Sequence, residues 1–130
     1  MIACYYQINT FNQQYQEKFR YINNIKIGTP MNGDVLMTIL PEILVEFCGA
    51  TAVGYNRSTN VYWCKMMHCE ICLLHIDLHI SQTNSRTTDI IITPSIGADQ
   101  TIAHFVSNLK ESIELYNTSA FFRKTLGIGL

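Results

Sequence analysis

The stretch HCEICLLHIDLHI, residues 68–80, is the longest strand candidate in the chain and decides how the other elements can be arranged. Successive side chains of a strand point to opposite faces, so its apolar residues from position 74 onward share one face. They are Leu74, Ile76, Leu78 and Ile80. The opposite face carries His75, Asp77 and His79. One apolar and one polar face are typical of an antiparallel sheet that is covered on one side only, which is the arrangement we predict.

The same stretch contains residue types that bind metals. Neighbouring positions on one face of a strand are about 6.6 Å apart, so two of His75, Asp77 and His79 could share an ion, whereas the outer pair is about 13 Å apart. A metal site would therefore need a further ligand from another element. Cys69 and Cys72, taken as part of one continuous strand, point to opposite sides and are interpreted as small core residues. We expect no metal or other cofactor, and a small metal-dependent enzyme built on the three polar residues is the alternative.

A helix is predicted upstream of this strand. Residues 28–33 form a break of Gly, Pro and Asn, and Asp34 can cap the apolar segment that follows. Gly49 suits the end of the helix. Pro41 lies inside the helix, where it removes a hydrogen bond, so we expect a kink or two short helices end to end. Before the break, residues 17–27 alternate as a half-buried strand.

The remaining elements follow from the same patterns. Residues 50–55 and 61–67 are strand-like and are joined by the polar turn NRSTN, which predicts a hairpin. Residues 89–93 form a short strand. A final helix, capped by Asp99 or Thr101, carries one apolar stripe made of Ile102, Phe105, Val106, Leu109, Ile113 and Tyr116. The sequence therefore predicts an α+β fold, with an antiparallel sheet of four to five strands and two helices packed on one face.

Composition argues against several classes of protein. Of the 130 residues, 48% are hydrophobic and 15% are charged, which argues against disorder. The formal net charge of −1 provides no general attraction to nucleic acid, so no nucleic-acid partner is expected. Five cysteines, an odd number, and a start without the pattern of a signal peptide favour reduced thiols in a cytoplasmic protein. The chain has no nucleophile elbow, phosphate loop or dinucleotide motif, so we predict a non-catalytic domain.

Read as one unit, Lys18 to Tyr116 resembles kinase-associated domain 1, the C-terminal regulatory domain of microtubule-affinity-regulating and AMP-activated-type Ser/Thr kinases. The resemblance is one of element order and apolar spacing. An aromatic strand (KFRYINNIKI) opens the unit, and a polar break with a proline precedes a helix (GTPMNGDVLMTIL). A cysteine-bearing turn leads into strands (FCGATAVGYN, then VYWCKMM), and the longest strand follows (CEICLLHIDLHIS). A short strand then passes into the terminal helix (TDIIITPSIGADQTIAHFVSNLKESIELY).

The resemblance implies a regulatory domain that binds acidic phospholipids and can restrain an adjoining kinase domain. We place this single domain at residues 17–117, between an N-terminal extension or edge strand at residues 1–16 and a C-terminal tail at residues 118–130. The expected partners are a protein, for which a kinase catalytic domain is the candidate, and an acidic membrane surface to which the domain would attach peripherally.

Basic residues are the candidate binding site for an anionic partner. Lys18, Arg20 and Lys26 lie on the outward face of the first predicted strand, and Arg123 with Lys124 forms a second cluster. Each basic residue near an anionic membrane contributes about 1 kcal/mol, so these residues could support weak recruitment. An ordinary solvated strand face is the competing interpretation. The apolar tail AFFRKTLGIGL suggests a third class of function, a structural partner subunit.

Overall fold

The computed structural model describes residues 25–126. Within this range one strand and one helix are followed by four strands and two helices. In chain order the elements are β1 (Ile25–Thr29), α2 (Gly33–Glu46), β2 (Ala52–Asn56), β3 (Val61–Cys69), β4 (Cys72–Gln82), β5 (Thr88–Pro94), α3 (Asp99–Thr118) and α4 (Ala120–Thr125). The extension predicted at residues 1–16 and the start of the first predicted strand lie outside the described residues.

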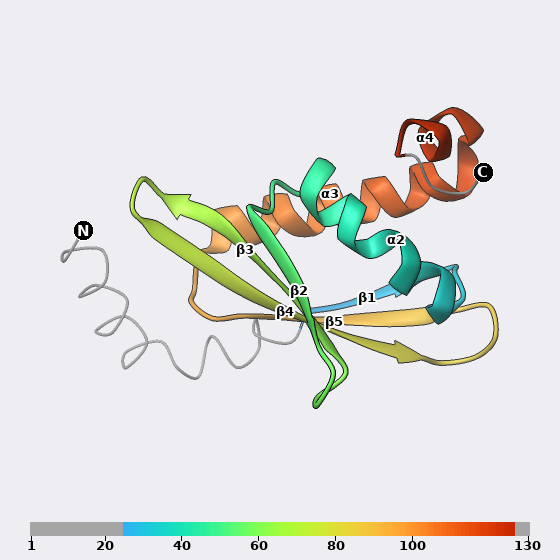
Figure 1. Cartoon of the computed structure of the whole chain (residues 1–130), viewed down its shortest axis with the longest axis horizontal. Helices are drawn as coiled ribbons and strands as arrows, with labels where there is room; N and C mark the ends of the chain where they lie inside the picture. The colour runs from blue at the N-terminus through green and yellow to red at the C-terminus, as the bar shows by residue number, and fades with distance from the viewer. Residues whose placement is uncertain (1–24, 127–130) are drawn as a thin grey trace.

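The five strands form one antiparallel sheet in the order β1-β5-β4-β3-β2. The strands from β2 to β5 pair with their sequence neighbours, whereas β1 pairs with β5 at the far side of the sheet. α2 and α3 lie on the same face of the sheet (Figure 1). This arrangement confirms the predicted α+β fold, with two helices covering one face of an antiparallel sheet.

The core lies between the sheet and these two helices. Leu74, Ile76 and Leu78 of β4 are fully buried, as the alternation of that strand predicts, and β5 contributes Ile90 and Ile92 in the same way. The buried apolar helix residues are Leu36, Ile39, Leu40, Ile43 and Leu44 of α2 and Ile102, Phe105, Leu109 and Ile113 of α3. Each large apolar side chain contributes about 1.5–3 kcal/mol when fully buried, so this layer is the main source of stability.

Residues 68–80 do not form one continuous strand. β3 ends at Cys69, residues 70–71 form a turn, and β4 starts at Cys72. Cys69 and Cys72 are therefore directly opposite each other across a hairpin, and the prediction that they point to opposite sides of the sheet is wrong. The turn, Glu70–Ile71, has none of the Gly or Asn residues that usually mark a two-residue hairpin. The reversal is imposed by the antiparallel pairing of β3 with β4, and the register shifts between Met67 and Cys69 to accommodate it.

The start of α2 is capped differently from the prediction. Asn32 is the N-cap, and its side-chain oxygen accepts a hydrogen bond from the backbone N–H of Asp34 at 2.8 Å. Asp34 instead lies in the first turn, where a negative charge interacts favourably with the helix dipole. Beyond the other end of the helix, Gly49 has a φ of 74°, which agrees with its predicted role in the stop because glycine adopts this conformation without a steric penalty.

Pro41 lies inside α2, which continues through it as one helix, so the alternative of two short helices is wrong. A proline has no N–H to donate to the carbonyl four residues earlier, which here belongs to Met37. The hydroxyl of Tyr62, on β3, donates a hydrogen bond to this carbonyl oxygen at 3.2 Å. Burial, and to a lesser degree the neighbouring Tyr55, raises the pKa of Tyr62, so its hydroxyl stays protonated as a donor. The sheet thus satisfies the acceptor that the proline leaves open.

Replacing Tyr62 by phenylalanine should lower the free energy of unfolding by about 1 kcal/mol, because the Met37 carbonyl then loses its donor. The loss should be much smaller in a Pro41→Ala background, where an alanine N–H can bond the same carbonyl. Urea unfolding of the two single variants and the double variant measures this coupling. Tyr55→Phe is the matched control, since its hydroxyl bonds the exposed Asn60 side chain. An equal loss in both backgrounds would contradict the proposed role of Tyr62.

The C-terminal elements extend further than the predicted domain. α3 runs to Thr118, and the helix α4 lies within the segment expected to be a tail. Phe122 of α4 is buried, and its ring centroid lies 4.6 Å from that of Phe47 at the end of α2. Part of residues 118–130 therefore packs on the core. α3 begins at Asp99 after Ala98, which provides no side-chain cap, so neither Asp99 nor Thr101 has the predicted capping role.

The cysteines differ in their surroundings. Cys48 and Cys64 are buried in the core and carry free thiols. Cys72 takes part in a disulfide bond, so the expectation that all the thiols are reduced is wrong at this position.

Candidate functional site

The polar face of β4 is the first candidate site, and it lies on the side of the sheet away from the helices. Asp77 is the cross-strand partner of Trp63, and His75 is that of Lys65. His75 Nε2 lies 2.9 Å from Asp77 Oδ1, so these two side chains bond each other. His79 is exposed on the same strand. Among residues 25–126 no three His, Cys, Asp or Glu side chains are grouped closely enough to hold a metal ion.

Trp63 organises this outer face. Its ring lies over Gly54 of β2, where an added Cβ would come within 2.3 Å of the indole. The ring stacks on His75 with centroids 5.7 Å apart, and the Lys65 amine lies 5.7 Å from the Trp63 ring. The cluster links β2, β3 and β4 through side-chain contacts. Trp63 lies outside the core, because the core face of β3 is occupied by residues such as Cys64.

The predicted basic residues do not form one surface in the described part of the chain. Lys26 is exposed on β1, but its amine is 3.2 Å from the Asp89 carboxylate of β5. Arg123 donates a hydrogen bond to the Tyr116 carbonyl and stacks over the Tyr116 ring. Lys124 is exposed on α4. Lys18 and Arg20 lie outside the described residues.

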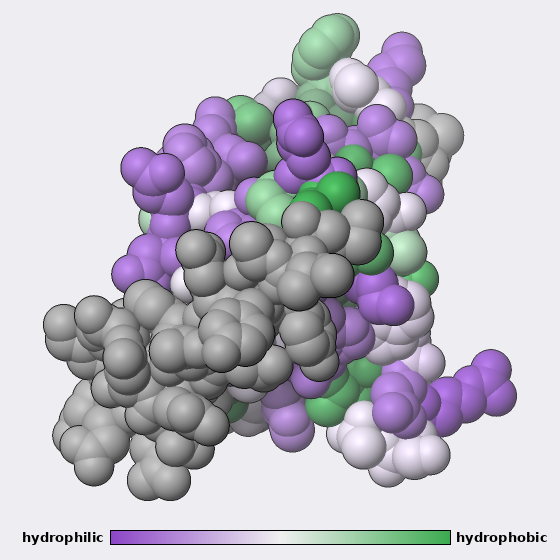
Figure 2. Space-filling view, turned by 90° about the vertical axis from the view of Figure 1, so that its left-hand side faces the viewer, coloured by the Kyte–Doolittle hydropathy of each residue, from purple (hydrophilic) through white to green (hydrophobic). Residues whose placement is uncertain are grey.

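Seen from the left-hand end of Figure 1, the described surface mixes hydrophilic residues with smaller hydrophobic areas (Figure 2). The formal net charge of the whole chain is close to zero at −1. A domain of this kind has little long-range field, so recognition has to depend on local geometry.

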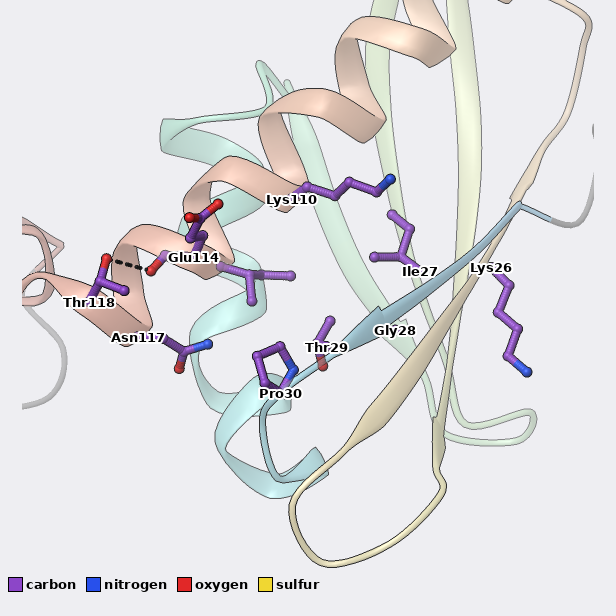
Figure 3. Close-up of a pocket in the computed structure, with 10 residues that line it drawn as sticks. Lys26, Ile27, Gly28, Thr29, Pro30, Lys110, Glu114, Asn117 and Thr118 are labelled. Atoms are coloured by element: carbon purple, nitrogen blue, oxygen red, sulfur yellow. Dashed lines mark hydrogen bonds between the residues drawn. The ribbon is translucent and has the colours of Figure 1, made fainter.

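A groove between β1 and α3 is the second candidate site. β1 is at the end of the sheet order, and no strand among residues 25–126 pairs with its outer edge. One hollow of about 430 Å³ lies between residues 26–30 on one wall and the part of α3 from Lys110 to Thr118 on the other (Figure 3). Strand edges expose backbone N–H and C=O groups, so this wall of the groove can form hydrogen bonds with an added strand.

A second hollow, of about 530 Å³, continues the groove toward the start of α3. Most of its surface is apolar and comes from Ile25 of β1 and from Ile102, Ala103 and Val106 of α3. The charged residues that line it are Asp99, at the start of α3, and Lys110. Lys110 lines both hollows and marks the boundary between them. The groove therefore has an apolar half and a polar half, with one lysine between them.

The end of β1 is held in place by buried hydrogen bonds. The Thr29 hydroxyl donates to the Thr88 carbonyl at 3.0 Å, and the Thr88 hydroxyl donates to the Met31 carbonyl at 2.7 Å. Both threonines are buried. This wall of the groove is formed before any ligand binds, which reduces the entropy that binding would cost.

Sequence reasoning did not identify the groove. The amphipathic pattern of α3 predicted which residues face the sheet, but Ala103 and Lys110 fall at the flank of that pattern. Their role depends on the position of β1 as an edge strand, and that position follows from the pairing of β1 with β5. A local sequence signal for this pairing is absent, because the two strands are separated by most of the domain.

Comparisons of the chain with protein-family models, with curated proteins and with solved structures gave no match. In the part of the chain that the structure describes, no helix combines the length and the apolar character needed to cross a membrane.

Proposed function

We propose that this domain is a non-catalytic regulatory module that binds a partner protein, and that an extended segment of the partner lies along β1 in the groove beside α3. The observation that carries the proposal is an edge strand with an open groove along it. Addition of a strand to a sheet edge is a general mode of peptide recognition, in which backbone hydrogen bonds provide affinity and side-chain pockets provide specificity. The resemblance to kinase-associated domain 1 suggests a kinase catalytic domain as the partner.

An extended protein segment fits the groove better than a membrane does. The groove presents backbone and apolar side chains together, and a membrane cannot form β-sheet hydrogen bonds. Of the predicted basic stripe, the structure describes Lys26, which is already paired with Asp89. Recruitment to an acidic membrane is therefore the alternative that the peptide-binding and vesicle-binding measurements distinguish.

Filling the apolar hollow should weaken the binding of peptides selected on this domain. Ala103 is exposed on α3 and lines that hollow, so Ala103→Trp occupies the space without disturbing the core. Excluding one large apolar side chain of the ligand forfeits about 1.5–3 kcal/mol, which corresponds to a loss of affinity of about 10–150-fold. The measurement is the affinity of peptides selected from a random displayed library on the full chain.

Ala120→Trp is the matched control, because Ala120 is also exposed but lies on α4. It should retain wild-type affinity, and hydrogen exchange of the β1 amides should slow when peptide binds. Selected peptides that bind Ala103→Trp as tightly as the wild type would overturn the proposed site. Recovery of no peptide, together with salt-sensitive binding to vesicles of acidic lipid, would overturn protein binding in favour of the membrane.

A further inference from the structure

We infer that the segment bound along β1 presents an apolar side chain to the hollow beside Ala103 and Val106 and, two residues away, a carboxylate to Lys110. This inference rests on the proposed function and adds the chemistry of the partner. The contact with Lys110 makes the groove selective for an acidic segment, although the protein as a whole has a net charge of −1.

Lys110 is the cation that the groove leaves available. Its side chain extends from α3 toward β1, whereas Lys26 projects away from α3 (Figure 3). Lys26 is paired with Asp89, and the ion pairs among residues 25–126 do not include Lys110. Glu114, one turn further along α3, also lines the groove without forming an ion pair with Lys110. A carboxylate that enters the groove opposite Lys110 therefore meets a lysine without a competing partner.

The apolar side chain is specified by the other half of the groove. Ile25 and Val106 are half-buried and Ala103 is exposed, so apolar surface remains open to solvent there. A partner side chain that covers this surface gains the hydrophobic contribution without displacing any residue of the domain. The hollow of about 530 Å³ has room for an aliphatic side chain such as that of leucine.

The spacing between the two groups follows from element geometry. Val106 and Lys110 are four residues apart on a helix that rises about 1.5 Å per residue, so their backbones are about 6 Å apart along the axis. Side chains two residues apart on an extended strand share one face and are about 6.6 Å apart. The partner segment therefore has an apolar residue, then any residue, then an acidic residue. This order is read in whichever chain direction the added strand runs. An acid placed further along, beside Glu114, would be repelled.

Short synthetic peptides test the pattern on the full chain. Each carries Leu at one position and Glu, Gln or Lys two residues away, on either side of the Leu, with Thr and Val at the other positions. The Glu peptides in the preferred direction should bind the wild-type protein about tenfold more tightly than the Lys peptides. The difference should shrink as salt is raised, because the paired groups lie at the surface.

Charge reversal identifies the residue responsible. Lys110→Glu should reverse the preference, so that the Lys peptides bind more tightly than the Glu peptides. Lys124→Glu changes the net charge equally but lies on α4, and it should leave the preference unchanged. Both lysines are exposed, so thermal unfolding of the variants should match the wild type.

The outcomes separate the inference from the function on which it rests. Equal binding of the Glu, Gln and Lys peptides would overturn the acidic preference while leaving peptide binding intact. An equal loss of preference in both charge-reversed variants would also overturn it, since a general field would then explain the selectivity. Absence of binding by every peptide, including those selected from the random library, would overturn the groove as a peptide site altogether.

Discussion

Replacing Phe105 by alanine should lower the free energy of unfolding by about 3–5 kcal/mol. Phe105 is 1% exposed and lies on the face of α3 that packs against the sheet. Its removal loses the transfer free energy of the ring and leaves a cavity that the surrounding aliphatic side chains fill only partly. Domains of this size are stable by about 5–15 kcal/mol in total, so the variant should unfold at a much lower urea concentration than the wild type.

Phe121→Ala is the matched control for this variant. Phe121 is 80% exposed on α4, so the same substitution there should change the free energy of unfolding by less than about 0.5 kcal/mol. Urea unfolding of both variants, followed by circular dichroism, makes the comparison. A loss below about 0.5 kcal/mol for Phe105→Ala would mean that α3 does not pack against the sheet through this residue.

The thiols of Cys48 and Cys64 should be alkylated about 1,000-fold more slowly in the folded protein than in the unfolded protein. Burial raises the pKa of Cys48 from its ordinary 9.0 to about 12, with the neighbouring Cys64 adding to the rise. Burial likewise raises the pKa of Cys64 from 9.0 to about 12, with the charge of Asp77 adding to it. The thiolate is the reactive form, so a rise of about three pH units reduces it about 1,000-fold at neutral pH, before steric protection is counted.

Peptide mapping by mass spectrometry after timed treatment with iodoacetamide measures these rates. The peptides that contain Cys48 and Cys64 should be labelled rapidly in urea and hardly at all without it. Similar rates in both conditions would show that these thiols are accessible and contradict their place in the core. The raised pKa values also make the folded state less stable above pH 9. There the unfolded thiols ionise while the folded ones hold their protons until about pH 12.

Periodic patterns in the sequence were sufficient to predict the layers of the fold. The alternation around Leu74, Ile76 and Leu78 predicts three buried side chains, and all three are buried. Of the predicted stripe on α3, Ile102, Phe105, Leu109 and Ile113 are buried, whereas Val106 and Tyr116 are only partly buried. The reason is that burial of an apolar face is a local requirement, which each element expresses in its own residues whatever its neighbours are. The order of elements and the covered face follow from such patterns, which gave the number of strands only as four to five, whereas the sheet has five.

Features that depend on two distant segments were decided only by the tertiary structure. The reversal at Glu70–Ile71 follows from the pairing of β3 with β4, and the tolerance of Pro41 follows from a hydroxyl donated by Tyr62. The ring of Trp63 packs over Gly54, on another strand, where an added Cβ would clash with it. In each case the stabilising partner is absent from the local sequence, so no local pattern could reveal it.

The candidate site belongs to the second group almost entirely. Of the basic residues predicted from sequence, Lys26 lines the groove but is paired with Asp89, while Lys110 was not singled out. On sequence alone Lys110 is an ordinary charge on the polar side of a helix, as Lys124 is. The sequence by itself determined which face of α3 is buried, whereas the placement of β1 at the sheet edge decided which of the exposed residues beside that face line a groove. That β1 has no strand beyond it among residues 25–126 is a property of the whole sheet, because it depends on where every other described strand has gone.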